Sequence, residues 1–136
     1  MLHHVEIYVS NLGRSRTFWE WLLCEELGYE IYQEWPKGVS FRPAAEVGKS
    51  TESPYLVFVQ TEEKHLDMKF HRCRTGLNHL AFRADSKLQV DDLTAKLRER
   101  GIIILYADRH PHAGGPDSYA VFFEDPDRIK VELAHP

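Results

Sequence analysis

The sequence of 136 residues has few cysteines and no long apolar run, and both absences exclude classes of protein. The two cysteines, Cys24 and Cys73, have neither the number expected of a disulfide scaffold nor the spacing of a cysteine metal site. No stretch approaches the roughly 18 apolar residues of a membrane helix, and the amino-terminal residues lack a signal-peptide pattern. We therefore expect a protein of a reducing compartment, the cytoplasm, with no membrane partner.

An excess of charge of one sign is also missing. The chain has 17 Lys and Arg against 21 Asp and Glu, a net charge of -4, and the basic residues are scattered among acidic ones. Proteins that bind a phosphate backbone normally present a basic face, so we expect no nucleic-acid partner. Hydrophobic residues make up 43% of the chain, an ordinary share for a globular domain.

The second half of the sequence repeats the pattern of the first. At an offset of 75 residues "HVEIYV" lies over "HLAFRA", which places His4 on His79. Two extra residues in the first copy then bring Gly28 onto Gly101. Each copy predicts an alternating strand, an amphipathic helix closed by glycine, and three further strands. We expect an α+β fold in which one domain, residues 1–136, contains module 1 (1–62) and module 2 (74–136).

Each module is therefore a predicted βαβββ unit. In module 1 the helix is expected over about 12–27, and the later strands near 29–35, 39–42 and 55–61. In module 2 Ser86 and Gln89 form a capping-box pattern at the helix start, and the later strands are expected near 102–107, 119–123 and 129–134. A sheet that packs helices on one face would leave the other face as the concave wall of a ligand cleft.

Strand alternation turns both repeated histidines the same way. His4 shares its face with Glu6 and Tyr8, because the apolar side chains between them must pack under the helix. By the same rule His79 shares the open face of module 2 with Arg83. His3, one position off, is expected on the packed side.

The last strand, "IKVELAH", adds a carboxylate to this face. Its apolar residues pack under the helix, so Glu132 turns toward the side where His4 and His79 point. Two neutral imidazoles and one carboxylate are suitable ligands for a divalent Zn, Ni, Mn or Fe ion, with coordination positions left for a substrate. We therefore predict a metal site, provided that both modules share one cavity.

On these residues the chain resembles the vicinal oxygen chelate superfamily, which includes glyoxalase I, the fosfomycin- and bleomycin-resistance proteins and the extradiol dioxygenases. The resemblance covers essentially the whole chain, through "HHVEIYVSNLGRSRTFW", "GLNHLAFRA" and "FFEDPDRIKVELA". It implies paired βαβββ modules that form a curved mixed sheet around a metal cleft. It also implies metal ligands at His4, His79 and Glu132, and catalysis on a small substrate whose adjacent oxygens chelate the ion.

The chain departs from the family pattern in several places. Glyoxalase I typically adds a ligand from the last strand of module 1, where "YLVFVQ" offers about Phe58 as the counterpart of Glu132. We expect no counterpart of the basic tail of fosfomycin-resistance enzymes, and extradiol dioxygenases are usually longer. The turn "DPDR" has Arg128 where the family commonly has glycine. The resemblance therefore leaves lyase, isomerase and ring-cleaving dioxygenase chemistry open.

Other residues are candidates for the chemistry itself. Glu6, on the face of His4, is a candidate general base. His110 and His112 lie in the loop "DRHPHAGGPDSY", before the strand that flanks Glu132, and are candidate acids or bases. The candidate substrate-binding residues are the polar Tyr8 and Arg83 and the apolar Phe58 and Phe122. Each could instead have a purely structural role.

Two kinds of function fit these observations. The first is an enzyme in which the metal acts as a Lewis acid on a small molecule. The second is a metal-free protein that sequesters an aromatic or cationic compound, as bleomycin-resistance proteins do. The family frequently dimerises, sometimes with exchange of modules, so a homodimer is expected. Whether His4 meets His79 of its own chain or of a partner stays open in the sequence.

Overall fold

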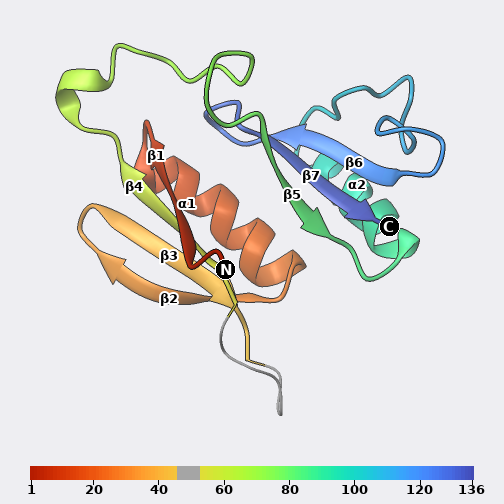
Figure 1. Cartoon of the computed structure of the whole chain (residues 1–136), viewed down its shortest axis with the longest axis horizontal. Coiled ribbons are helices and arrows are strands. Elements are labelled where there is room, and N and C mark those ends of the chain that lie inside the picture. The colour runs from red at the N-terminus through yellow and green to blue at the C-terminus, as the bar shows by residue number, and fades with distance from the viewer. Residues whose placement is uncertain (46–52) are drawn as a thin grey trace. The chain divides into compact units, whose positions relative to one another are not determined.

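The structure, a computed structural model, describes residues 1–45 and 53–136, which form two compact units (Figure 1). Unit 1 spans Met1–Lys69 and unit 2 spans Phe70–Pro136. The boundary falls inside the charged linker between the two repeats. Each unit has its own sheet and its own helix.

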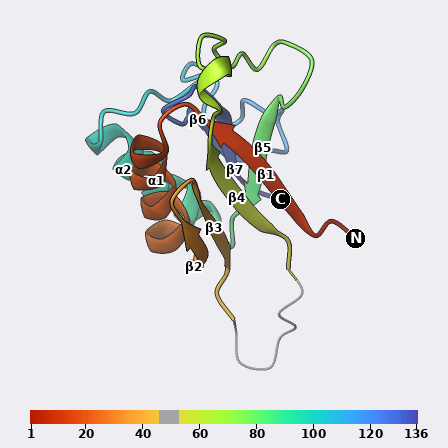
Figure 2. The same cartoon turned by 90° about the vertical axis from the view of Figure 1, so that its left-hand side faces the viewer.

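Unit 1 contains a four-stranded sheet in the order β1-β4-β3-β2. Its elements are β1 (His4–Val9), α1 (Leu12–Glu20), the π-helical segment η1 (Trp21–Glu26), β2 (Tyr29–Trp35), β3 (Gly38–Pro43), β4 (Tyr55–Gln60) and the short 3-10 helix η2 (Glu63–His65). The first strand, β1, runs parallel to β4, and the other neighbours are antiparallel. In Figure 1 and Figure 2, α1 lies against one side of this sheet.

The helix of unit 1 begins where the sequence predicts. Asn11 caps α1 by accepting a hydrogen bond from the backbone N of Arg14 at 3.0 Å. The helix continues as η1 to Glu26, and Gly28 leaves it with a φ of +72°, a backbone conformation that favours glycine. Gln60, at the end of β4, accepts a hydrogen bond from the backbone N of Leu12 and so ties the helix start to the sheet.

The core of unit 1 lies between this helix and the sheet. Trp19 stacks on Phe58, with ring centroids 4.6 Å apart and an interplanar angle of 25°, and Phe41 packs edge-on against Phe58. All three side chains have no exposed surface. They are joined in the core by Val9, Leu22, Leu23 and Val39.

Unit 2 repeats this plan with one strand fewer. Its elements are β5 (His79–Arg83), α2 (Lys87–Glu99), β6 (Tyr119–Glu124) and β7 (Lys130–His135), in the sheet order β5-β7-β6, with β5 parallel to β7. The expectation of a strand near 102–107 is wrong, because this segment forms only one bridge, between Leu105 and Phe122. Tyr106 has a φ of 55°, which is incompatible with an extended strand.

The helix of unit 2 packs on one face of its sheet. Ser86 caps α2 by accepting from the backbone N of Gln89, and the Gln89 side chain accepts from the backbone N of Asp85, which confirms the predicted capping signal. The residues buried between helix and sheet are Val90, Leu93, Leu97, Val121, Phe123, Val131 and Leu133.

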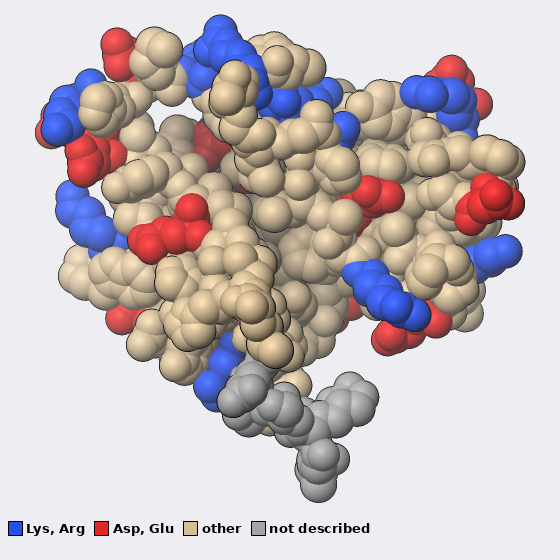
Figure 3. Space-filling model, in the orientation of Figure 1, with Lys and Arg blue, Asp and Glu red and all other residues tan. Residues whose placement is uncertain are grey.

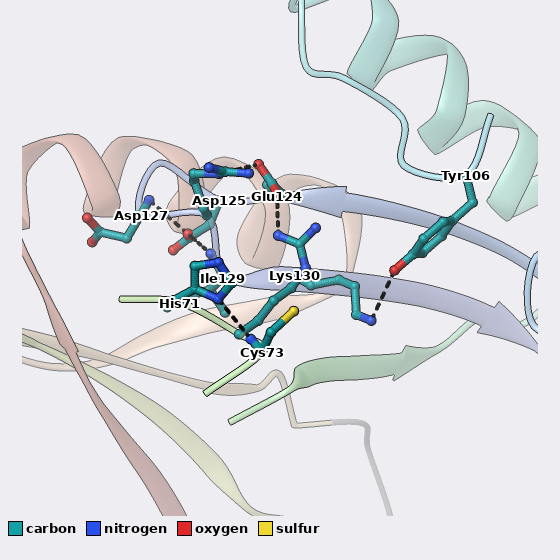
Figure 4. Close-up of polar contacts among 10 residues, drawn as sticks. His71, Cys73, Tyr106, Glu124, Asp125, Asp127, Ile129 and Lys130 are labelled. Carbon is teal, nitrogen blue, oxygen red and sulfur yellow. Dashed lines mark hydrogen bonds and ion pairs between the residues drawn. The ribbon is translucent and has the colours of Figure 1, made fainter. Parts of the chain in front are cut away.

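A tight turn joins β6 to β7. The buried carboxylate of Asp125 accepts from the backbone N of Asp127 at 2.9 Å and from that of Ile129 at 2.8 Å (Figure 4). Arg128 adopts a φ of 65° within this turn. The position where the sequence departs from glycine therefore has the left-handed conformation that glycine adopts most readily.

These observations confirm the α+β fold class and its two modules. Among the described residues, no helix is long and apolar enough to cross a membrane. Lys and Arg side chains lie among Asp and Glu side chains on the face drawn in Figure 3.

Candidate functional site

The candidate site of unit 2 lies on the sheet face opposite α2. Glu132 of β7 pairs in register with Ala81 of β5 and with Phe122 of β6, so these side chains share one face. Lys130 belongs to the same face, in register with His79 on one side and Glu124 on the other. Strand alternation therefore placed His79 and Glu132 correctly.

His79 and Glu132 are in direct contact. Nε2 of His79 lies 3.1 Å from Oε2 of Glu132, and 34% of the His79 side chain and 14% of the Glu132 side chain are exposed. Nδ1 of His79 lies 2.7 Å from Oδ1 of Asn78. In the neutral tautomer in which Nδ1 donates to this oxygen, Nε2 carries no proton.

This hydrogen bond determines what the opposite nitrogen can do. In the neutral ring Nε2 presents a lone pair to a carboxylate oxygen, and two lone pairs at this distance repel each other. A cation relieves the repulsion, either as a proton on Nε2 or as a metal ion held by both groups. The contact is an ion pair when the His79 ring is protonated, and both groups are of the kinds that bind divalent metal ions.

Tyr106 and Lys130 lie beside this pair, and the sequence interpretation assigned neither of them a role. Nζ of Lys130 donates to the hydroxyl of Tyr106 at 3.4 Å (Figure 4), and the Tyr106 ring packs edge-on against Phe122. Phe122 also contacts the ring of His79, at a centroid distance of 6.3 Å. Phe122, which the sequence predicts to bind substrate, therefore lies between the Tyr106 ring and the His79 imidazole and contacts both. Strand alternation could not find Tyr106, because it lies outside any strand.

The same face carries a second charged cluster around Glu124 of β6, in the register row of Lys130 and His79. Glu124 accepts from Arg72 in a very short contact and from Arg128 at 3.4 Å. The two arginines come from the linker segment and from the turn between β6 and β7. The negative charge of Glu124 is therefore neutralised by two arginines, whereas the carboxylate of Glu132 faces the imidazole of His79.

In unit 1 the repeated histidine has a different environment. The His4 ring stacks on Tyr55, its register partner on β4, with centroids 4.9 Å apart and an interplanar angle of 15°. Nδ1 of His4 lies 2.8 Å from Nδ1 of His3. His3 precedes β1, is exposed and contacts both rings, so the expectation that it faces the packed side is wrong.

The three other polar candidates lie on exposed strand faces. Glu6 and Tyr8 are exposed on β1, alternating with the more buried Val5, Ile7 and Val9, as predicted. Arg83 is exposed at the end of β5. Within the described ranges 1–45 and 53–136, no three His, Cys, Asp or Glu side chains are close enough together to hold a metal ion.

Phe58 does not fit its predicted position in a substrate cleft. It pairs in register with Ile7 and is fully buried against Trp19, on the face covered by α1. The residue in register with Glu6, and therefore the counterpart of Glu132, is Val57. The prediction was one position off, which reverses the face of a strand residue. Valine, like phenylalanine, offers no metal ligand.

His110 and His112 also lie away from Glu132. The His112 ring packs edge-on against Tyr119, whose hydroxyl donates to Asp91 of α2 at 2.7 Å. Burial, and then the positive charge of Arg98 in α2, lower the pKa of His110. Both histidines therefore lie on the α2 side of the sheet, and their role as acids or bases stays a prediction.

Comparisons with known proteins agree with this architecture. Residues 1–133 match the model of the family described as the Glyoxalase/Bleomycin resistance protein/Dioxygenase superfamily. The uncharacterized protein YqjT of Bacillus subtilis (strain 168) is 56% identical over 135 residues, 99% of this chain and 98% of that protein.

Solved structures show the same similarity. The crystal structure of a "putative glyoxalase" from Bacillus halodurans is 59% identical, with a TM-score of 0.91, over 100% of this chain and 96% of that one. Lactoylglutathione lyase from Agrobacterium tumefaciens is 20% identical, with a TM-score of 0.66, over 99% of this chain and 92% of that one; this likeness shows the fold alone. The chain belongs to the Glyoxalase/Bleomycin resistance protein/Dioxygenase superfamily.

Proposed function

We propose that the protein is a divalent-metal-dependent enzyme that acts on a small substrate with adjacent oxygen atoms. The observation that carries this proposal is the contact between Nε2 of His79 and the carboxylate of Glu132, with Asn78 on the other ring nitrogen. Metal-binding histidines commonly donate their second N–H to a carbonyl or carboxylate oxygen, which fixes the ring orientation. The three residues of unit 2 fit that arrangement.

The proposed ligands are His79, Glu132 and His4. The repeat supports the third ligand, because His4 and His79 are the first residues of the corresponding strands β1 and β5. A set of imidazoles and one carboxylate suits Zn, Ni, Mn or Fe. When bound, the ion supplies Lewis acidity that polarises a substrate carbonyl or stabilises negative charge on a substrate oxygen.

The neighbouring side chains would bind and orient the substrate. The Lys130 ammonium lies over the Phe122 ring, 5.9 Å from its centroid, and donates to the Tyr106 hydroxyl; we propose that both groups donate hydrogen bonds to an anionic substrate oxygen. Phe122 supplies an apolar wall. Glu6 and Tyr8 of module 1, and Arg83 of β5, are proposed as further polar groups, with Glu6 as the base that accepts a substrate proton.

The family offers three reaction classes for this site: lyase, isomerase and ring-cleaving dioxygenase. A screen of oxo-aldehydes, catechols and epoxides with the metal-loaded protein would distinguish these classes. The valine at the module 1 position that corresponds to Glu132 supports a site with fewer ligands than the glyoxalase I pattern.

The test is metal binding by the purified protein. We expect the apoprotein to take up about one equivalent of Zn²⁺, Ni²⁺, Mn²⁺ or Fe²⁺ per site, and to gain thermal stability from it. Glu132→Gln and His79→Asn should each weaken metal affinity at least about tenfold. The matched control is Glu124→Gln, which removes a carboxylate from the same face and should leave metal affinity unchanged. Equal metal affinity in wild type and Glu132→Gln contradicts the proposal.

We also propose a homodimer in a reducing, cytoplasmic compartment. The free thiols of Cys24 and Cys73 support the reducing compartment. Light scattering on the purified protein tests the oligomeric state. A monomer at micromolar concentration contradicts the dimer without affecting the metal proposal.

A further inference from the structure

Unit 1 contains a pocket that the proposed metal chemistry does not use. Its volume is about 380 Å³, within the range of small-molecule sites. Its polar and aromatic lining comes from the residues before β1 and from β2, β3 and the start of β4: His3, Tyr32, Arg42, Ser53 and Tyr55. The side chains of Met1 and Leu2 complete the wall and provide its apolar part.

Two tyrosines give the pocket flat aromatic walls at an angle to each other. The rings of Tyr32 and Tyr55 lie 5.2 Å apart at an interplanar angle of 70°. The His3 ring lies edge-on to Tyr55 at 5.3 Å. Tyr32 occupies the irregularity in the pairing of β2 with β3, where the register shifts between Ile31 and Gln33. Such bulges redirect a side chain and commonly lie at functional sites.

Arg42 provides one cationic group in this pocket. Its Nε donates to Glu30 at 2.7 Å, and its guanidinium lies over the Tyr32 ring, 4.6 Å from the centroid. Within residues 1–45 and 53–136, its hydrogen bond is made by Nε alone. The two terminal nitrogens can therefore donate in parallel to a second carboxylate, a geometry that guanidinium groups favour.

We propose that this pocket binds an aromatic carboxylate. The aromatic ring packs against Tyr32 and Tyr55, and the carboxylate pairs with the terminal nitrogens of Arg42. The positive charge of Arg42 disfavours a cationic ligand, and the tyrosine rings favour a flat ligand over a puckered one. This inference goes beyond the proposed function, because it requires neither Glu132 nor a metal ion.

The position of Tyr55 relates the pocket to the candidate ligand His4. Tyr55 has the pocket on one side and stacks face to face with His4. A ring bound in the pocket therefore lies next to the His4–Tyr55 stack. An aromatic carboxylate held there would change the environment of the His4 ring, which an NMR signal of that imidazole reports.

The experiment titrates benzoate into metal-free protein kept in EDTA and follows backbone amide and histidine signals by NMR. We expect saturable shifts in the segments that line the pocket, and at His3 and His4. Cyclohexanecarboxylate keeps the charge but lacks the aromatic ring, and benzyl alcohol keeps the ring but lacks the charge. Each should bind at least about fivefold more weakly than benzoate, because each loses one of the two contacts.

Variants separate this pocket from the metal site. Arg42→Gln should weaken benzoate binding at least about tenfold, while Arg42→Lys should retain part of it, since lysine keeps the charge without the paired donors. Glu30→Gln removes the competing carboxylate, so we expect benzoate to bind as tightly as in wild type or more tightly. Arg83→Gln and Glu132→Gln are controls in unit 2 that should leave benzoate affinity unchanged.

Three outcomes overturn the inference: no saturable benzoate binding, equal affinity for benzoate and cyclohexanecarboxylate, or unchanged affinity in a folded Arg42→Gln variant. If Arg42→Gln does not fold, Tyr32→Leu provides the same test through the ring contact. Benzoate binding that is unchanged in Glu132→Gln would support the pocket. If the wild-type protein also takes up no metal, the metal proposal fails while the pocket proposal stands. The two proposals can therefore fail separately.

Discussion

Replacing Phe58 by alanine tests which face of β4 this residue occupies. Phe58 has no exposed surface and stacks on Trp19 at 4.6 Å. Fully buried phenylalanines cost roughly 3–5 kcal/mol when cut to alanine, because apolar burial is lost and a cavity remains. The stacked geometry places Phe58 toward the upper part of that range, because an aromatic pair adds about 0.5–1.5 kcal/mol.

The assay is urea unfolding followed by tryptophan fluorescence, since Trp19 lies against the altered side chain. With a slope of about 1–3 kcal/mol per molar urea, a loss of about 4 kcal/mol lowers the unfolding midpoint by roughly 2 M. That loss is a large part of the roughly 5–15 kcal/mol by which domains are stable. Phe58→Leu keeps most of the volume and should cost roughly 1–2 kcal/mol.

The matched control is Tyr8→Ala, on the neighbouring strand. Tyr8 is 60% exposed, so its removal should change the free energy of unfolding by less than about 0.5 kcal/mol. A Phe58→Ala variant that loses less than about 1 kcal/mol, with an unchanged denaturant slope, would refute the burial of Phe58 under α1. It would restore the earlier prediction that Phe58 lines a cleft.

Three further predictions concern single side chains. Burial and the charge of Arg98 lower the pKa of His110, so its NMR titration should have a midpoint below 6.5; a midpoint at or above that value contradicts its placement beside α2. Because the unfolded chain binds this proton first, stability should fall as the pH drops from 6.5 toward the native midpoint, and His110→Asn should reduce that fall. Burial, and then nearby Glu20, raise the pKa of Cys24, whereas Cys73 is exposed, so a thiol reagent at pH 7.5 should label Cys73 quickly and Cys24 slowly; Cys73→Ser should remove the fast phase and no other. Arg128→Gly should stabilise unit 2 by about 0.5–1 kcal/mol, because it relieves a φ of 65° and removes only an exposed ion pair; a lower unfolding midpoint than wild type would contradict this.

The repeat made most of the fold predictable from the sequence. The alignment of His4 with His79 predicted where the two modules begin. The alternating pattern of β1, β5 and β7 predicted which side chains point away from the helix. These signals are local and repeated, so one copy supports the interpretation of the other. The prediction that His79 and Glu132 turn to the same face depended only on these patterns.

The parts that failed are those without such a pattern. The segment before Tyr106 has the composition of a strand, but the left-handed φ of Tyr106 interrupts the extended backbone. The loop of His110 and His112 carries no periodicity, so the sequence could not tell which face of the sheet it follows. Phe58 was displaced by one residue, because "YLVFVQ" is apolar throughout and its two faces look alike in the sequence.

The pairing of the first strand of each unit with its last strand has a consequence for synthesis on the ribosome. The sheet of unit 1 can close once β4, which ends at Gln60, has emerged, but β5 has no neighbour until β7 emerges and ends at His135. At about 5–20 residues per second, the intervening translation takes roughly 4–15 s. During that interval the nascent chain carries one folded sheet and one unfinished one, and the contact between His79 and Glu132 is among the last to form.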